Sequence, residues 1–358
     1  MKAIRRALDT RKNQPASSLS GPEIVVYTEP LSTKMTFIYT TCRKDPKLKW
    51  FVDSLYNQIL DASFDIANIQ LVIVDFELQY DETRRTRFSG IVNGRFDFVH
   101  VTPKPSPWQG AHRLTKMNCF SASLSRNTGI CYARNPYVFF IDDLCVLAAG
   151  SFKHMVEYAK KQIIVGFSYK KVHDLVVVNG HVESVRETPS GIDTRYHLDI
   201  FTRLPGSSLF GYSASPLNAI LSVNGYDEIC NSVAGEDYNY GIRVEKAGNE
   251  IYYSKHVLFY ETEDTVDEVT FLRRDPYITD GEYGELMKRF NIIKRWDLNG
   301  RTDISHLVLD LLTRDKTWTE GNDYNLSELR SLIQNGGPFP ATFDPDMRTI
   351  EGILLRDL

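Results

Sequence analysis

Two adjacent carboxylates, Asp142 and Asp143, end an otherwise apolar and aromatic run that reads PYVFFIDDLCV, Pro136–Val146. A carboxylate removed from water is destabilised unless a partner compensates it, and two adjacent carboxylates repel each other. If the strand end is exposed, the pair is a solvated turn, as is common in α/β proteins. If the strand end opens into a cleft, the pair favours a divalent cation, because Mg²⁺ and Mn²⁺ prefer hard oxygen ligands.

A second carboxylate pair, Glu236 and Asp237, opens a segment in which Tyr238, Ile242 and Ala247 share one helical face. The pattern predicts a helix with acidic first residues, and the positive end of the helix dipole keeps such groups ionised. An ionised carboxylate can act as a general base. Acidic residues also cap helices without any catalytic role, so this pair alone is compatible with both interpretations.

Alternating strands and helices precede the first pair. Strands are expected at 36–42, at the apolar run 69–76, at 96–101 and at the run before Asp142; helices are expected after Asp45-Pro46 and at 119–133. This alternation predicts an α/β fold with a mostly parallel central sheet, right-handed crossovers and flanking helices.

Polar side chains follow the predicted strands at the edge of the sheet where parallel α/β proteins bind ligands. They are Thr40, Thr41 and Arg43 after the first strand, Asp75 after the second, and the pair Asp142 and Asp143. Because these strand ends place polar groups around one crevice, the functional interpretation of the pair gains weight over the solvated turn.

The chain is expected to comprise an N-terminal extension (1–33), an α/β domain (34–264) and a helical C-terminal region (265–358). Residues 1–33 are polar and rich in Ser, Pro and basic residues. Strands are expected at 163–167 and 175–185, the second with a hairpin turn at Asn179-Gly180. Helical spacing returns after 265, and its apolar positions are Leu286, Met287, Phe290, Ile304, Leu307, Val308, Leu311, Leu326, Leu329 and Ile333.

Composition limits the classes of function. The 358 residues include 42 Lys and Arg against 46 Asp and Glu, so the net charge of −4 does not favour a nucleic-acid partner. No apolar run approaches the ~20 residues of a membrane span, and no apolar core of a signal peptide follows the basic start, which predicts a cytoplasmic protein. Five cysteines without a CxxC pair predict neither a zinc ribbon nor a disulfide framework.

Four motifs in order give the chain a resemblance to a known family. SRNTGICYARNPYVFFIDDLCV, NGYDE, GED and AGNEIYY resemble segments of the nucleotide-sugar glycosyltransferases of the GT-A fold, in particular inverting family 2. The similarity covers about Met35 to Glu261. It implies a metal-dependent transferase that moves a sugar from a nucleoside-diphosphate donor to a hydroxyl acceptor and inverts the anomeric centre. Only the resemblance to the family favours UDP as the donor nucleotide.

The resemblance also implies roles for single residues. On the donor side, Thr40, Thr41 and Arg43 would hold the base and ribose, Asp75 the base, and Arg126 and Asn127 the nucleotide. Asp142 would meet the ribose and, with Asp143, bind Mn²⁺ or Mg²⁺ at the diphosphate. Asp237 would be the general base, with Glu236 beside it near the acceptor.

The sequence departs from the family pattern at the metal motif. Leu144 stands where many relatives have a third acidic residue, so the register of the motif leaves open whether Asp142 or Asp143 is the metal ligand, and Asp143 is favoured. Relatives often have a metal-binding His after the Ile-Tyr-Tyr strand, whereas this chain has Glu261 at the aligned position and His256 five residues earlier. Either could be the third ligand, and either could be structural.

Other functions remain as alternatives. A sugar nucleotidyltransferase would need a Gly-rich loop after the first strand, and TTCRKDP is not such a loop; dinucleotide and P-loop motifs are absent from the sequence. A nucleotide-sugar-binding module without catalysis, or a transferase whose acceptor is a modified nucleic-acid base, is compatible with the same motifs, although the charge balance does not favour the latter.

Overall fold

The computed structural model describes residues 33–105, 120–228 and 236–264, residues 317, 319 and 322, and residues 324–340. All described residues belong to one compact unit. The predicted N-terminal extension up to residue 32 and the helical spacing at 286–290 and 304–311 therefore lie outside the described residues. The predicted boundary at 264/265 stays a prediction.

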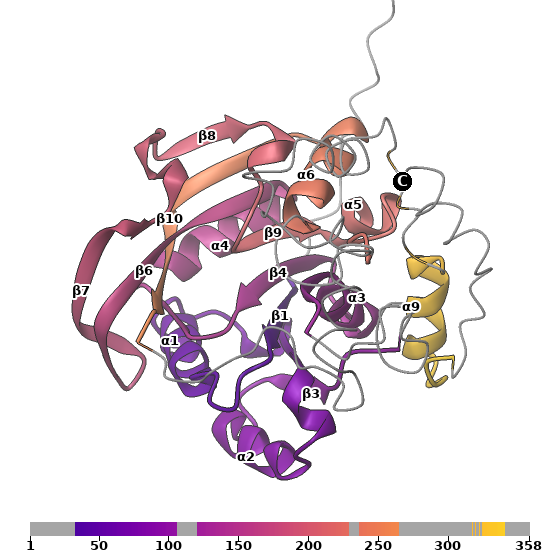
Figure 1. Ribbon diagram of the computed structural model, residues 1–358, viewed down its shortest axis with the longest axis horizontal. Helices are drawn as coiled ribbons and strands as arrows, with labels where there is room; N and C mark the ends of the chain where they lie inside the picture. The colour runs from indigo at the N-terminus through magenta and orange to yellow at the C-terminus, as the bar shows by residue number, and fades with distance from the viewer. Residues whose placement is uncertain are drawn as a thin grey trace, which may run out of the picture. The chain divides into compact units, whose positions relative to one another are not determined.

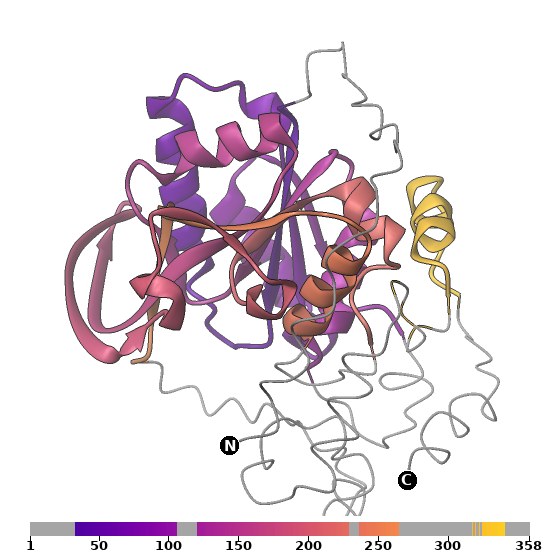
Figure 2. The same ribbon diagram turned by 90° about the horizontal axis from the view of Figure 1, so that it is seen from above.

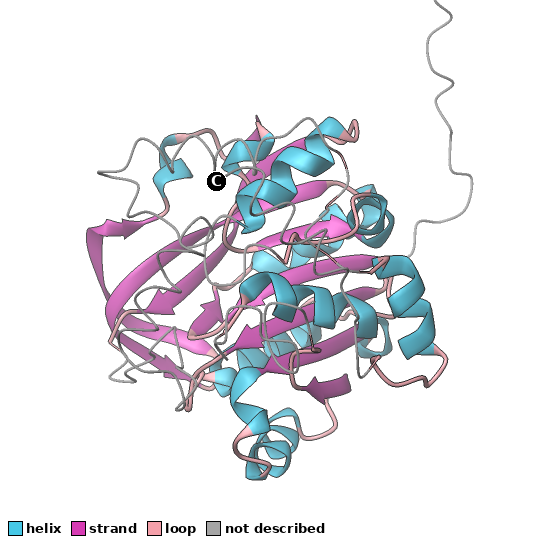
Figure 3. Ribbon diagram, turned by 45° about the vertical axis from the view of Figure 1, so that its right-hand side comes forward, coloured by secondary structure: helices cyan, strands magenta, loops and turns pink. Residues whose placement is uncertain are grey.

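One sheet organises the described part of the chain, with helices packed against it (Figure 3). The path of neighbouring strands is β3-β2-β1-β4-β9-β6-β10-β5, and β7 and β8 pair with β6 and β10. The strands are β1 (Met35–Thr41), β2 (Ile69–Asp75), β3 (Asp97–Val101), β4 (Tyr137–Asp142), β5 (Cys145–Leu147), β6 (Ile164–Val178), β7 (His181–Ile192), β8 (Phe201–Leu204), β9 (Ser213–Pro216) and β10 (Ile251–Thr262).

The four strands β3-β2-β1-β4 are parallel, and the second half of the sheet is mixed. The prediction of an α/β fold around a mostly parallel sheet flanked by helices is confirmed. The register places Thr40 opposite Asp142 and Thr41 opposite Asp75. The polar residues after β1, β2 and β4 therefore share one sheet edge, as expected.

Helices cover both faces of the sheet. They are α1 (Leu48–Asp61), α2 (Thr83–Val92), α3 (Ala122–Tyr132), α4 (Ser151–Lys161), α5 (Leu217–Ser222), α6 (Glu236–Lys246) and α9 (Leu326–Gln334). Figure 2 shows α1 and α4 on one side of the sheet and α6 on the other. Side chains alternate along β1, so Phe37 and Tyr39 join the core under α1, while Ile38 joins the core under α3. Among the described residues, no helix is long and apolar enough to cross a membrane.

The region after β5 differs in one respect from the prediction. The expected strands at 163–167 and 175–185 are parts of two longer strands, because β6 continues through the polar stretch SYKKVHD up to the Asn179-Gly180 turn. Pairing with β10 on one side and β7 on the other satisfies the backbone there, so the polar side chains do not end the strand. The hairpin turn itself is confirmed.

Helix α9 confirms the helical spacing at Leu326, Leu329 and Ile333, and it lies beside α3 (Figure 1). Leu326 and Leu329 are buried in the core of that face. Upstream of the helix, Tyr324 joins a buried group in which Lys104 pairs with Glu228 at 3.0 Å. This segment is therefore fastened to the α/β domain by apolar and polar contacts.

Gly129 is required where α3 crosses β1. A Cβ at this position would lie 2.3 Å from Cγ2 of the buried Ile38. Alanine would add about 1 kcal/mol of helix propensity, but overpacking of a core costs about 1–3 kcal/mol. We therefore expect Gly129→Ala to lower the free energy of unfolding, measured by urea denaturation. Gly90→Ala is the control, because a Cβ there would meet nothing within 4 Å; a Gly129→Ala protein as stable as wild type would contradict the close approach.

Candidate active site

The two carboxylate pairs are joined by one buried arginine. Arg126 extends from α3, and its Nη1 donates to Oε1 of Glu236 at 2.6 Å while its Nη2 donates to Oδ1 of Asp142 at 3.3 Å. Its guanidinium also lies 5.2 Å from the ring centroid of Tyr226. Burial lowers the pKa of Arg126, but Glu236, Asp142 and then Asp237 more than offset this and raise it. Residues predicted separately from the strand end and from the helix start thus form one cluster.

Asp143 is held from the β1 side of the cluster. Thr41 Oγ1 donates to its Oδ2 at 2.7 Å, and Arg43 Nε donates to its Oδ1 at 3.2 Å. Burial raises the pKa of Asp143 to about 7, and Arg43 and Thr41 offset the effect only in part. Thr41 and Arg43 therefore orient Asp143 in the structure, whereas the resemblance assigns them to the base and ribose; that role stays a prediction.

The turn after the pair depends on Leu144. This residue has φ 63°, a left-handed conformation that a Leu side chain rarely adopts. Its N–H donates to Pro46 O at 3.0 Å, its carbonyl accepts from Thr262 N at 3.2 Å, and its side chain is buried. The apolar residue at the family's third acidic position is thus part of the packing that holds the turn.

Glu261, a residue of β10, lies beside the pair Asp142 and Asp143. Its carboxylate accepts from Tyr212 Oη at 3.2 Å and pairs with Lys171 Nζ at 3.2 Å. Burial raises the pKa of Glu261, Lys171 lowers it, and Asp142 raises it again. Glu261 is therefore close enough to Asp142 for the two charges to interact, but Lys171 already compensates it.

The two acidic residues at the start of α6 have different surroundings. Asp237 is half-buried, and its carboxylate accepts from the backbone N–H of Gly211 at 2.9 Å and of Tyr238 at 2.8 Å. Glu236 is buried, and no described residue bonds to its Oε2. Burial and then Asp237 raise the pKa of Glu236, and Arg126 opposes this shift. Asp237 is thus oriented by backbone groups, while Glu236 depends on Arg126.

Asp75, a predicted donor-binding residue, has structural partners instead of open surface. Asp75 has no exposed area, and its oxygens accept two bonds from Arg84, at 2.6 and 2.9 Å, and lie 3.0 Å from His100 Nε2. Arg84 also donates to the carbonyls of Arg43 and Lys44. Through Arg84, Asp75 therefore supports the loop that carries Arg43.

Asn127 and Thr40 are also buried. The amide of Asn127 donates to Tyr226 O at 2.8 Å and accepts from Tyr226 N at 2.8 Å, and it donates to Glu228. These bonds hold the NGYDE segment, in which Asn224 and Gly225 both have positive φ. Thr40 is 4% exposed and lies in the ladder opposite Asp142.

His256, the alternative third metal ligand, has a described partner on α4. Its exposed ring stacks on His154 of α4, with centroids 4.3 Å apart. Burial and the neighbouring His154 lower the pKa of His256. Its role as a metal ligand stays a prediction.

The pair Asp142 and Asp143 fits a hard divalent cation that takes only some of its ligands from the protein. In the part of the chain that the structure describes, no three His, Cys, Asp or Glu side chains gather into a metal-binding group. Mg²⁺ commonly takes one or two carboxylates and completes its shell with substrate phosphates and water. Asp142 and Asp143 match this pattern, and 40% of the Asp142 side chain is exposed.

Several residues of the cluster could not be found from the sequence. Lys171 lies within a long polar-looking stretch, and Tyr212 and Gly211 precede a short strand that has no motif. Only Tyr226, the aromatic residue of NGYDE, was part of a recognised segment. Long-range strand pairing brings the others to the site.

Comparisons with known proteins give likenesses at the level of the fold. No family model and no curated protein matches the chain. It is similar to a structure of S. aureus TarS (12% identity, 78% of this chain and 44% of that chain, TM-score 0.45) and to TarS 1-349 in complex with UDP-GlcNAc (14%, 78% and 70%, 0.43). It is also similar to GalNAc-T7 with UDP, GalNAc and Mn²⁺ (10%, 86% and 59%, 0.44). The chain thus spans less than half of the first TarS structure, and the roles of single residues rest on the motifs and contacts above.

Arg126 should be essential for the stability of the cluster. Arg126→Met leaves Glu236 and Asp142 uncompensated, and removing one partner of a buried ion pair costs about 3–5 kcal/mol. The loss is expected in urea unfolding at pH 8 and should be smaller when Glu236→Gln is present in the same protein. Arg134→Met is the control, because Arg134 pairs with Asp97 at the surface, where a pair contributes about 0–1 kcal/mol. Additive effects of the two substitutions would contradict the bridge.

Asp143 should make stability depend on pH. Its folded pKa of about 7 lies above its ordinary value of 3.8, so the native state binds more protons than the unfolded state between these values. Wild type is therefore expected to lose stability as pH rises through this window. Asp143→Asn removes this loss, so its stability relative to wild type should rise from pH 4 to pH 8 in urea unfolding without divalent cations. The exposed Asp199→Asn variant is the control, and a pH-independent difference for Asp143→Asn would contradict the prediction.

Proposed function

We propose that this protein is a metal-dependent, inverting glycosyltransferase that uses a nucleoside-diphosphate sugar, with a UDP-sugar favoured, and a hydroxyl acceptor. The observation that carries the proposal is the bridge from Asp142 to Glu236 through Arg126. It joins the motif that the resemblance assigns to the donor with the motif that it assigns to the acceptor. A transferase needs both substrates at one reacting centre.

The donor side would be formed by Asp142 and Asp143. These carboxylates would hold Mn²⁺ or Mg²⁺, which neutralises the charge that develops on a departing diphosphate. Thr41 and Arg43 fix the orientation of Asp143, so they act as positioning residues in addition to any contact with the nucleotide. Arg126 is buried between carboxylates, and we therefore assign it to positioning as well.

The acceptor side would be formed by the start of α6. Asp237 removes the proton of the acceptor hydroxyl as its oxygen attacks the anomeric carbon. The bond from that carbon to the phosphate oxygen breaks on the opposite face, and the diphosphate leaves with the electron pair, which inverts the anomeric centre. The backbone N–H groups of Gly211 and Tyr238 hold the carboxylate in one orientation. Glu236, with one oxygen free of described partners, would contact the acceptor beside it.

Asp237→Asn tests the assignment of the base. We expect sugar transfer to fall by about 10²–10⁴-fold, because a positioned general base contributes that factor. Binding of the donor should change little, because Asp237 lies on the acceptor side. Transfer would be followed as nucleotide release from UDP-, GDP- and dTDP-sugars, UDP-GlcNAc among them, with hydroxyl acceptors from mono- and oligosaccharide panels. Asp199→Asn should behave as wild type.

Asp142→Asn and Asp143→Asn test the donor side in the same assay. Thermal stabilisation by the donor should require Mn²⁺ or Mg²⁺, disappear with EDTA and disappear in both variants. Stabilisation that survives EDTA, with no turnover on any acceptor, would favour a binding module without catalysis. No response to any donor with any metal would contradict the proposed function.

A further inference from the structure

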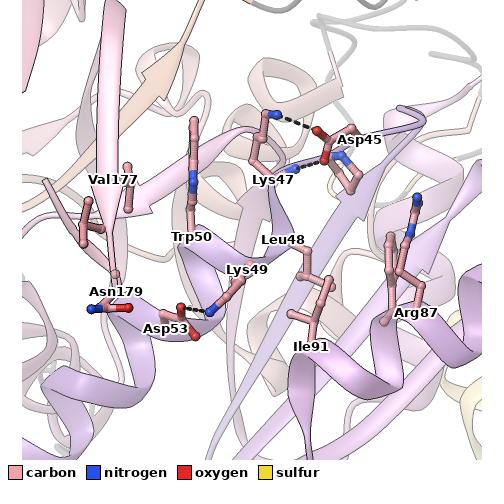
Figure 4. Close-up of a pocket in the computed structure, with 14 residues that line it drawn as sticks. Asp45, Lys47, Leu48, Lys49, Trp50, Asp53, Arg87, Ile91, Val177 and Asn179 are labelled. Carbon is pink, nitrogen blue, oxygen red and sulfur yellow. Dashed lines mark hydrogen bonds and ion pairs between the residues drawn. The ribbon is translucent and has the colours of Figure 1, made fainter.

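A cavity of about 520 Å³ lies outside the cluster of carboxylates (Figure 4). Its walls come from the loop before α1 and the first turns of that helix, from α2, and from the tip of the β6–β7 hairpin. None of the proposed donor, acceptor or metal residues lines it. The volume lies within the range of about 300–1,000 Å³ that is typical of small-molecule sites.

The hairpin tip is fixed against α1, so the cavity is formed before any ligand binds. Asn57 Nδ2 donates to Asn179 O at 2.7 Å. Gly180 has φ 79°, and a Cβ there would lie 2.5 Å from the backbone of Asp53 and Ser54. Because the backbone of the tip lies this close to α1, the wall formed by Val177 and Val178 keeps its place over that helix. A preformed site loses less entropy on binding than a flexible one.

The lining combines a flat aromatic ring with paired polar groups. The half-buried indole of Trp50 stands between Val177 and the charged residues (Figure 4). Lys47 pairs with Asp45 at 2.5 Å, and Lys49 pairs with Asp53. Each pair offers hydrogen-bond donors and acceptors side by side.

This chemistry suits a carbohydrate. The C–H faces of a pyranose ring pack on an aromatic plane, and its hydroxyls both donate and accept hydrogen bonds. The lining has two carboxylates, Asp45 and Asp53, against three cations, Lys47, Lys49 and Arg87, so its net charge of +1 (3 − 2) attracts a strongly anionic ligand only weakly. A purely apolar ligand would leave these charged groups without solvent.

The wall of the cavity is also connected to the candidate active site. Pro46 lines the cavity, and its carbonyl accepts from Leu144 N at 3.0 Å and from Tyr39 Oη at 2.6 Å. Leu144 directly follows Asp142 and Asp143. In the same loop, Arg43 pairs with Asp143. The loop between β1 and α1 therefore contacts Asp143 near its start and lines the cavity near its end.

We propose that this cavity is a carbohydrate-binding subsite that holds a segment of the acceptor away from the hydroxyl that receives the sugar. The role of the bound glycan as acceptor rests on the proposed function, whereas its binding in the cavity does not. Trp50 is the platform for a sugar ring, and the Asp45–Lys47 and Lys49–Asp53 pairs bond to hydroxyls.

The test measures glycan binding without donor or metal. The full chain would be applied to a printed array of defined neutral and acidic oligosaccharides, and the strongest binder would be titrated by calorimetry. Trp50→Ala should weaken binding by about tenfold or more, and Trp50→Phe should retain most of it because a ring remains. Phe201→Ala, which removes an exposed ring on β8 outside the cavity, should bind as wild type.

Val178→Asp is a second variant. We expect it to fold as wild type does, because 41% of Val178 is exposed. It leaves Trp50 in place and puts a charge on the cavity wall, so binding should again fall. Because the assay contains no donor and no metal, its result is independent of the proposed catalysis. Absence of binding to every oligosaccharide, or equal binding by wild type, Trp50→Ala and Val178→Asp, would overturn the proposal.

Discussion

The contact of Arg126 with Glu236 and Asp142 is the interaction on which the candidate site depends. Three ionisable side chains from α3, α6 and the end of β4 meet there, and burial penalises an uncompensated charge on Arg126 or Glu236. The guanidinium suits this position because its planar fork can bond to two carboxylates at once. Without it, the two acidic motifs would repel each other.

A second constraint comes from the loop between β1 and α1. Arg84, itself bound to the buried Asp75, holds two carbonyls of this loop, and the loop in turn bonds to Asp143 and to the turn at Leu144. The left-handed Leu144 persists because both of its backbone groups are bonded and its side chain is buried. The same loop then forms a wall of the cavity beside Trp50. Buried polar contacts thus make a rigid connection from the sheet edge to two separate surfaces.

Predictions from the sequence were most successful where a local pattern was also the physical determinant. The apolar runs of β1, β2 and β4 are buried strands, and their ends do lie at one edge, because parallel strands with crossovers leave no other arrangement. The pattern failed along β6, where pairing on both sides overrides polar composition. It also could not distinguish an exposed polar residue from a buried one, as Asp75 and Asn127 illustrate.

The sequence by itself determined the α/β class, the common edge of the strand ends and the two acidic pairs, because each follows from periodicity and local composition. Only the tertiary structure decided how these groups are partnered: that Arg126 joins the pairs, that Lys171 compensates Glu261, and that His256 stacks on His154. The physical reason is that a charge is stabilised by what lies around it in space. The neighbours of these residues come from strands and helices distant in the chain, and no local pattern carries that information.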